Sequence, residues 1–276
     1  MNAKVVNILK TYGIPADGFG TSEDSSVKNV LTGSVPGAKA LPLWLALRDA
    51  HPDTGVWPVI RGDASDQREE LEYDPAATLR GVPSGSVREV LRPRLEEQLE
   101  ILGKLIPDLS VDGNLTLEDL ARRVDQSGIH SFSGKGGGRE PWPTTSEHTE
   151  LDLHSTRNVL SKKMFRNVSL SLVVDAQPHE IPAWLDFGNW NECPKPELQV
   201  AVLREWGRKY GAVPICLTND VLECAVSKPP QTEEEALSLA SEQWIFCDDI
   251  VGQGTQSVRR LAMEIWRSPQ WFFWWD

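Results

Sequence analysis

The segment Trp271–Asp276 holds five aromatic residues in six positions. An aromatic side chain buries roughly 150–250 Å² in a core or an interface, so this segment has to pack against something. In a strand, odd-numbered and even-numbered positions would point to opposite faces, and here both sets are aromatic. A strand that is apolar on both faces belongs in the middle of a sheet or beneath a layer of helices. We therefore expect a central strand at this point.

Length and charge limit the function classes. A chain of 276 residues predicts two domains or one large one, and 40% apolar with 25% charged residues is an ordinary globular balance. The net charge of −12 argues against nucleic-acid binding and against an anionic membrane, but it is compatible with a basic protein partner. No apolar run of about 18 residues occurs, and the first ten residues lack the apolar core of a signal peptide. We expect a cytoplasmic location.

The cysteines and histidines do not form a metal-binding pattern. The four cysteines lie in the last third and form no C-x-x-C pair, which predicts reduced thiols in the core (Cys193, Cys216, Cys224 and Cys247). The five histidines are scattered, without H-E-x-x-H spacing. No metal and no cofactor is expected.

Residues 1–131 carry mainly helical signals. Apolar periodicity predicts a helix over 5–12, a helix that starts at Pro42, and the longest helix of the chain over 87–106. Thr116 is a capping residue for a further short helix. One strand, residues 56–60, interrupts this region, and Pro58 predicts an edge position because proline has no N–H to donate.

Beyond a segment rich in Gly, Pro and Ser/Thr, strands and helices are mixed. We expect a strand over 168–174, a helix opened by Pro194 and Pro196 and ended by Gly211, and a hairpin of 213–217 with 221–226. A helix should follow the capping box that begins at Thr232, and the last helix, from 258, should end before Pro269.

These signals predict an α+β protein with three parts. They are a mainly helical N-terminal region over 1–131, a linker or loop over 132–150, and a mixed-sheet α+β domain over 151–276 that the C-terminal strand closes.

The C-terminal part also resembles a known family. Over roughly 183–276 the separated motifs Trp190-Asn191-Glu192-Cys193-Pro194, Cys247-Asp248-Asp249-Ile250-Val251, Gln253-Gly254 and Phe273-Trp274-Trp275-Asp276 resemble the bacterial DUF4253 domain. The biochemical role of that family is not established, so the resemblance implies a domain and not a reaction. The kind of protein involved suggests a connection to toxin and immunity systems.

Four carboxylates are the candidate catalytic residues, namely Glu242, Asp248, Asp249 and Asp276. Brought together, they could act as acid, base or ligands of a hard cation. Alternatively, Asp248 and Asp249 cap a turn and Gln253 satisfies buried backbone groups.

Tryptophan is concentrated in the same region, since eight of the eleven residues lie from Trp184 onward. Some of them should be partly exposed, and exposed tryptophan is enriched at interaction hot spots. The alternative is packing in the core and at its rim. The candidate binding residues are Trp190, Asn191, Gln253, Trp274 and Trp275.

We therefore expect a non-enzymatic protein-binding module, an immunity-type protein that neutralises a basic toxin or effector. The alternative is a hydrolase or metal-dependent enzyme that uses the carboxylate cluster.

Overall fold

The computed structural model describes residues 1–21, 27–66, 73–106, 116–130, 140–146 and 148–276. Its described strands form one six-stranded sheet in the order β1 (Val30–Pro36), β3 (Asn167–Val174), β2 (Val56–Asp63), β4 (Ala212–Leu217), β5 (Val221–Val226) and β6 (Gln270–Trp274). The pairing of β2 with β4 is parallel and the other pairings are antiparallel. The protein is thus an α+β protein with a mixed sheet, as predicted.

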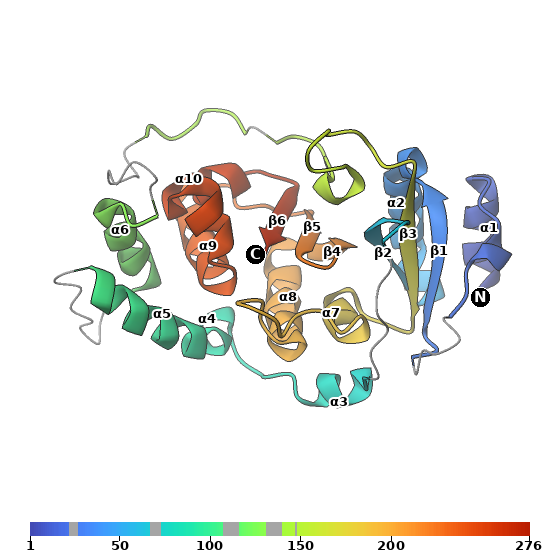
Figure 1. Ribbon diagram of the computed structural model, residues 1–276, viewed down its shortest axis with the longest axis horizontal. Helices are drawn as coiled ribbons and strands as arrows, with labels where there is room; N and C mark the ends of the chain where they lie inside the picture. Colours follow the sequence, from blue (N-terminus) through green and yellow to red (C-terminus); the bar gives the residue numbers. More distant parts are fainter. Residues whose placement is uncertain (22–26, 67–72, 107–115, 131–139, 147) are drawn as a thin grey trace.

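The sheet contains strands from both sides of the predicted linker. Two strands of the region 1–131, β1 and β2, pair with β3 (Figure 1). The strand β1 was not predicted from the sequence. The proposed division of the chain at 132–150 stays a prediction, and most of that segment lies outside the described residues.

The predicted edge position of β2 is wrong, because β2 lies between β3 and β4. Its parallel pairing with β4 is recorded at one position, Ile60 opposite Cys216. Three residues before Ile60, the indole N–H of Trp57 donates to the carbonyl of Pro214 in β4 at 3.1 Å. That side-chain hydrogen bond joins the two strands at the level where Pro58 has no N–H to donate.

The predicted central position of the last strand is also wrong. Among the described strands β6 pairs only with β5, so it is an edge strand that closes the sheet. Burial alternates along it: Trp271 and Phe273 are buried, whereas Phe272 is 39% exposed and Trp274 is half-buried. Only one face of β6 belongs to the core.

The described α-helices are α1 (Ala3–Thr11), α2 (Gly37–Thr54), α3 (Pro75–Arg80), α4 (Val87–Val90), α5 (Arg92–Leu105), α6 (Leu117–Ser127), α7 (Ile181–Trp184), α8 (Pro196–Tyr210), α9 (Glu233–Phe246) and α10 (Val258–Ile265). Figure 1 shows α1 and α2 beside the β1 end of the sheet, and α9 and α10 beside β6. None of the described helices combines the length and the apolar character needed to cross a bilayer.

Two helix predictions need correction. The helix predicted from Pro42 begins earlier, at Gly37, and contains Pro42 in its second turn. The predicted helix over 87–106 is broken at Leu91 into α4 and α5, so the longest described helix is α2 with 18 residues. The apolar periodicity continues across this break, but Pro93 fits only the first turn of a new helix.

The helices with clear end signals are confirmed. Thr116 caps α6, Thr232 forms the capping box of α9, and Gly211 ends α8 with a φ of 62°. The predicted strand over 168–174 and the hairpin of β4 and β5 are also present.

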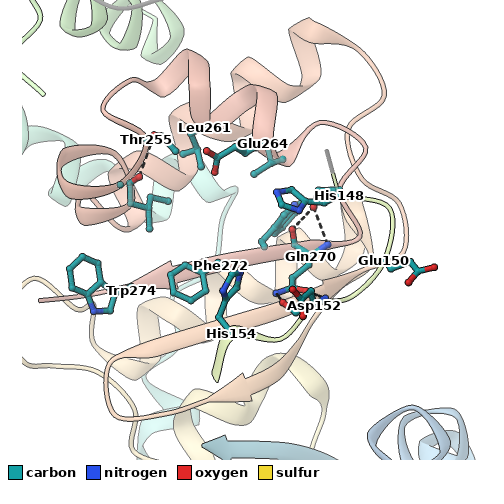
Figure 2. A pocket seen from close by; sticks show the side chains of 15 residues that line it. His148, Glu150, Asp152, His154, Thr255, Leu261, Glu264, Gln270, Phe272 and Trp274 are labelled. Carbon is teal, nitrogen blue, oxygen red and sulfur yellow. Dashed lines mark hydrogen bonds between the residues drawn. The ribbon is translucent and has the colours of Figure 1, made fainter. Parts of the chain in front are cut away.

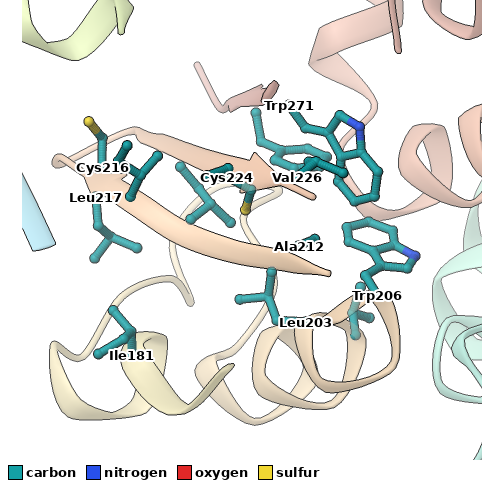
Figure 3. Packing of buried hydrophobic residues seen from close by; sticks show 14 of the residues in the cluster. Ile181, Leu203, Trp206, Ala212, Cys216, Leu217, Cys224, Val226 and Trp271 are labelled. Atoms are coloured by element: carbon teal, nitrogen blue, oxygen red, sulfur yellow. The ribbon is translucent and has the colours of Figure 1, made fainter. Parts of the chain in front are cut away.

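The aromatic residues of β6 pack on Trp206 of α8. The Trp206 ring stacks on Phe273 with centroids 5.6 Å apart and meets Trp271 edge-on at 5.7 Å. The ring of Phe246 on α9 packs against the rings of Trp206 and Phe273, with centroids 5.2 Å apart in each pair. Figure 3 shows Trp206 and Trp271 packed beside the β4–β5 hairpin. This core fixes β6 and therefore the surface that its other face presents.

Candidate functional site

Several of the predicted site residues meet at the C-terminal end of β6. Asp249 accepts a hydrogen bond from the backbone N–H of Asp276 at 3.1 Å and another from the side-chain amide of Gln253 at 3.0 Å. The amide of Asn191 donates to the backbone carbonyl of Asp276 at 2.7 Å. Both oxygens of Asp249 are therefore engaged in holding the end of β6 and the segment after α9.

The other two carboxylates point elsewhere. Asp248 accepts from the indole of Trp244 at 2.7 Å and from the amide of Gln98 on α5 at 3.1 Å. Glu242 is buried and accepts from the indole of Trp206 at 3.1 Å. The four predicted catalytic residues thus divide among three environments.

Glu242 also belongs to an ion-pair network between helices. Arg88 of α4 lies 3.4 Å from Glu242 and contacts Glu118 of α6 as well. Hydrogen bonding to Glu118 raises the pKa of Arg88. The described residues include no group of three or more His, Cys, Asp or Glu side chains arranged to hold a metal ion.

The predicted binding residues differ in burial. Trp275 is only 1% exposed and packs edge-on against Phe187 and Phe246. Asn191 and Gln253 are exposed, and Trp190 and Trp274 are half-buried. Trp275 is therefore a core residue, while the other four reach the surface.

A pocket of about 390 Å³, which was not predicted from the sequence, lies beside the outer face of β6 (Figure 2). Phe272 and Trp274 line it from the strand, and Leu261 and Glu264 line it from α10. The segment 148–154 contributes four polar side chains, which are His148, Glu150, Asp152 and His154. The pocket thus combines aromatic walls with several carboxylates.

A π-helix, Ile250–Thr255, forms another part of the lining. The hydroxyl of Thr255 donates to the carbonyls of Ile250 at 3.3 Å and of Ser257 at 3.0 Å, which secures the widened turn. Single π-helical turns are rare and occur frequently at functional sites. Its presence in the pocket lining is an argument, independent of charge, that this pocket has a function.

The segment 148–154 is tied to β6 by paired hydrogen bonds. The Gln270 side chain accepts from the Asp152 backbone N–H at 2.8 Å and donates to the Asp152 carbonyl at 3.0 Å. The ring of His154 meets Phe272 edge-on, with centroids 5.3 Å apart. These contacts hold the acidic segment at the rim of the pocket.

The buried carboxylate of Glu223 on β5 also holds the segment 148–154 and Gln270 in place through hydrogen bonds. It accepts from the backbone N–H of Ser155 at 2.7 Å, from the N–H of His154 at 3.2 Å and from the amide of Gln270 at 2.6 Å. Burial raises the pKa of Glu223, and the hydrogen bonds from Ser155 and His154 oppose that rise. Glu223 therefore positions the segment rather than facing a ligand.

One sequence signal could have found the pocket. Ionisable residues occupy every second position at 148, 150, 152 and 154, so in an extended segment they share one side. The pocket also needs Phe272, Leu261 and the π-helix, and no local pattern links these to that segment.

The four cysteines are free and buried, as predicted. Burial raises the pKa of Cys193 to about 12, and it also raises the pKa of Cys216, Cys224 and Cys247. Such thiols are poor nucleophiles at neutral pH.

The fold and the pocket define an α+β protein with a mixed sheet and an acidic, aromatic-walled surface pocket. Residues 169–276 match the family model described as "Domain of unknown function (DUF4253)", so the C-terminal part of the chain is a DUF4253 domain. The match begins within β3, earlier than the resemblance that the motifs indicated, and includes all of β4, β5 and β6. No curated protein and no solved structure matches the chain.

Proposed function

We propose that the protein is a protein-binding module whose acidic, aromatic-walled pocket receives a basic segment of its partner. The observation that carries this proposal is the outer face of β6, where Phe272 and Trp274 lie beside Glu264 and the acidic segment 148–154. Aromatic faces attract Lys and Arg cations, and the nearby carboxylates add charge complementarity. The net charge of −12 would speed the encounter with a basic partner.

The distribution of the predicted catalytic carboxylates also supports a binding role. Glu242, Asp248 and Asp249 each accept hydrogen bonds from other side chains or from backbone, which is the pattern of structural carboxylates. A hydrolase or metal-dependent enzyme would need several of them in one cleft. The alternative function therefore has less support.

The narrower form of the proposal is an immunity-type role in the cytoplasm, with a toxin or effector as the basic partner. The four reduced thiols are compatible with a reducing compartment. The acidic charge is compatible with the neutralisation of a cationic toxin.

A titration with a defined basic peptide tests the proposal. Oligolysine and oligoglutamate peptides would each be titrated into the full chain by calorimetry. We expect oligolysine alone to bind, and Phe272→Ser to weaken binding by about tenfold because an aromatic wall is lost. Ile101→Ser is the matched control, since Ile101 is an exposed apolar residue on α5.

A second pair of variants separates pocket binding from general charge attraction. Glu264→Gln removes a carboxylate that lines the pocket, and Glu97→Gln removes an exposed carboxylate on α5. Equal effects of the two substitutions, or equal binding of both peptides, would contradict the proposal. A partner captured by the wild-type chain but not by Phe272→Ser would then be purified and the complex rebuilt from pure components.

A further inference from the structure

A short hairpin, residues 157–165, presents apolar and basic side chains to solvent. Val159 is 77% exposed and Leu160 is 93% exposed, more than any other large hydrophobic residue described. Lys162 and Lys163 follow after Ser161 and are also exposed. No Asp or Glu occurs anywhere from 153 to 174, although the chain carries a net charge of −12. The hairpin is therefore a basic, apolar projection on an acidic protein.

Hydrogen bonds within the turn hold this projection in shape. The side chain of Asn158 accepts from the backbone N–H of Leu160 at 3.2 Å and of Ser161 at 2.9 Å. The backbone of Asn158 also donates to the carbonyl of Lys163 and accepts from the N–H of Lys162, both at 2.9 Å. A preorganised turn loses little conformational entropy when it binds.

The base of the hairpin is fixed next to the β1 end of the sheet. The N–H of Gly37 donates to the carbonyl of Arg166 at 3.0 Å, and the N–H of Phe165 donates to the carbonyl of Thr156 at 2.9 Å. A Cβ atom at Gly37 would lie 2.2 Å from the carbonyl oxygen of Phe165, so only glycine permits this approach. The first residue of the hairpin also contacts the pocket lining, because the guanidinium of Arg157 donates to the carboxylate of Asp152 at 3.0 Å, whereas the tip of the hairpin is left in solvent.

We propose that the hairpin of one copy of the chain inserts into the acidic pocket of a second copy, and that the contact is reciprocal. Leu160 would pack against Phe272, and Lys162 and Lys163 would face Glu150 and Glu264. In a two-fold symmetric dimer this contact forms twice. The chemistry is complementary in both respects, because an apolar and basic tip meets an aromatic and acidic pocket.

This inference rests on the proposed function, because it uses the same pocket. It names the chain itself as one basic partner. Self-association would then occupy the pocket until another basic partner displaces the hairpin, which gives the protein a means of masking its binding site.

Sedimentation equilibrium of the full chain tests the proposal. We expect a reversible dimer that weakens as salt is raised, since screening reduces the attraction between charges. The double variant Lys162→Glu/Lys163→Glu should dimerise at least about tenfold more weakly, because like charges would then meet in the pocket. The pocket variant Glu150→Lys/Glu264→Lys should show the same loss.

Mixing the two variants gives the decisive result. In the mixture an acidic hairpin can enter a basic pocket and a basic hairpin can enter an acidic pocket, so we expect a heterodimer that is tighter than the homodimer of either variant alone. Circular dichroism and urea unfolding would establish that both variants are folded. A wild-type chain that stays monomeric at the highest attainable concentration, or variants that fail to associate on mixing, would overturn the inference.

Two further measurements distinguish the dimer from the proposed peptide binding and from lipid binding. If Lys162→Glu/Lys163→Glu still binds oligolysine while the wild-type chain does not dimerise, the proposed function stands and the inference fails. If the wild-type chain does not dimerise and oligolysine does not bind, both the proposed function and the dimer are wrong. Binding of the monomeric wild-type chain, but not the hairpin variant, to phosphatidylserine vesicles would assign the hairpin to lipid and contradict the dimer.

Discussion

Asp125, near the end of α6, accepts a hydrogen bond from the backbone N–H of Val258 at the start of α10, at 2.8 Å and across 133 residues of sequence. Its other oxygen accepts from the N–H of Arg259 and from the hydroxyl of Ser257, both at 3.0 Å. A carboxylate from one helix thus caps the N-terminus of another. Because α10 forms one wall of the pocket, this capping contact also positions the candidate site.

Replacing Asp125 by alanine should lower the free energy of unfolding by about 2–4 kcal/mol. The substitution leaves three donors without their acceptor, namely the buried N–H of Val258, the buried hydroxyl of Ser257 and the partly buried N–H of Arg259. Urea unfolding of the full chain measures the change. Gln126→Ala is the control, because Gln126 is an exposed neighbour on the same helix, and an equal loss there would contradict the capping role.

The same residue gives a pH dependence. Burial raises the pKa of Asp125 above its ordinary value of 3.8, against the opposing hydrogen bonds from Arg259 and Val258. At pH values between 3.8 and the pKa of Asp125 in the folded chain, the folded state therefore binds more protons than the unfolded state. Over this range the free energy of unfolding falls as pH rises. Below pH 3.8 protonated Asp125 makes its full contribution to the free energy of unfolding.

Asp125→Asn removes this titration and so reveals its sign. The stability advantage of the wild-type chain over Asp125→Asn should shrink as pH rises from about 3.8 towards neutrality. Urea unfolding of both proteins over a pH series measures that difference. An advantage that grows with pH would mean that the hydrogen bonds outweigh burial and lower the pKa.

The buried thiols predict a slow reaction with disulfide reagents. At pH 8 a thiol with a pKa of about 12, as for Cys193, is thiolate far less often than an exposed one. We expect the native chain to react on the order of a thousandfold more slowly than the urea-unfolded chain. An aromatic disulfide reagent, followed by absorbance, counts the thiols. Unfolding should release four, and rapid reaction of any thiol in the native chain would contradict their burial.

The parts of the fold that could be predicted from the sequence are those with local signals. Thr232 and Gly211 mark helix ends through contacts within a few residues, so α8 and α9 were predicted correctly. The strand β1 was missed because its middle, Thr32-Gly33-Ser34, is polar and small. A Cβ atom at Gly33 would lie 2.8 Å from the ring of Phe19, so glycine is required at this position by a tertiary contact and not by local backbone preference.

The candidate site was predicted only in part, for a related reason. Asp249, Gln253 and Asp276 do meet, yet the sequence did not show that Asp248 turns towards Gln98, 150 residues away. The aromatic residues on both faces of the last strand predict a core strand, so Phe272 was not among the candidate binding residues, whereas Trp274 was. Their partial exposure depends on the pocket that α10 and the segment 148–154 build around them.

The alternation of burial along β6 continues to Trp275, the residue after the strand, and it predicts unequal roles for two neighbouring tryptophans. Trp275 is 1% exposed and contacts Phe187, Phe246 and Phe273, whereas Trp274 is half-buried at the pocket. Trp275→Ala should lower the free energy of unfolding by about 3–5 kcal/mol, because it leaves a cavity in the aromatic core.

Trp274→Ala should cost less than about 2 kcal/mol, since part of that side chain is already in water. It should instead weaken oligolysine binding, while oligolysine binding by folded Trp275→Ala stays close to that of the wild-type chain. Urea unfolding and calorimetric titration of the two variants side by side measure both effects. Equal destabilisation by the two substitutions would show that β6 packs on both faces, as a central strand would.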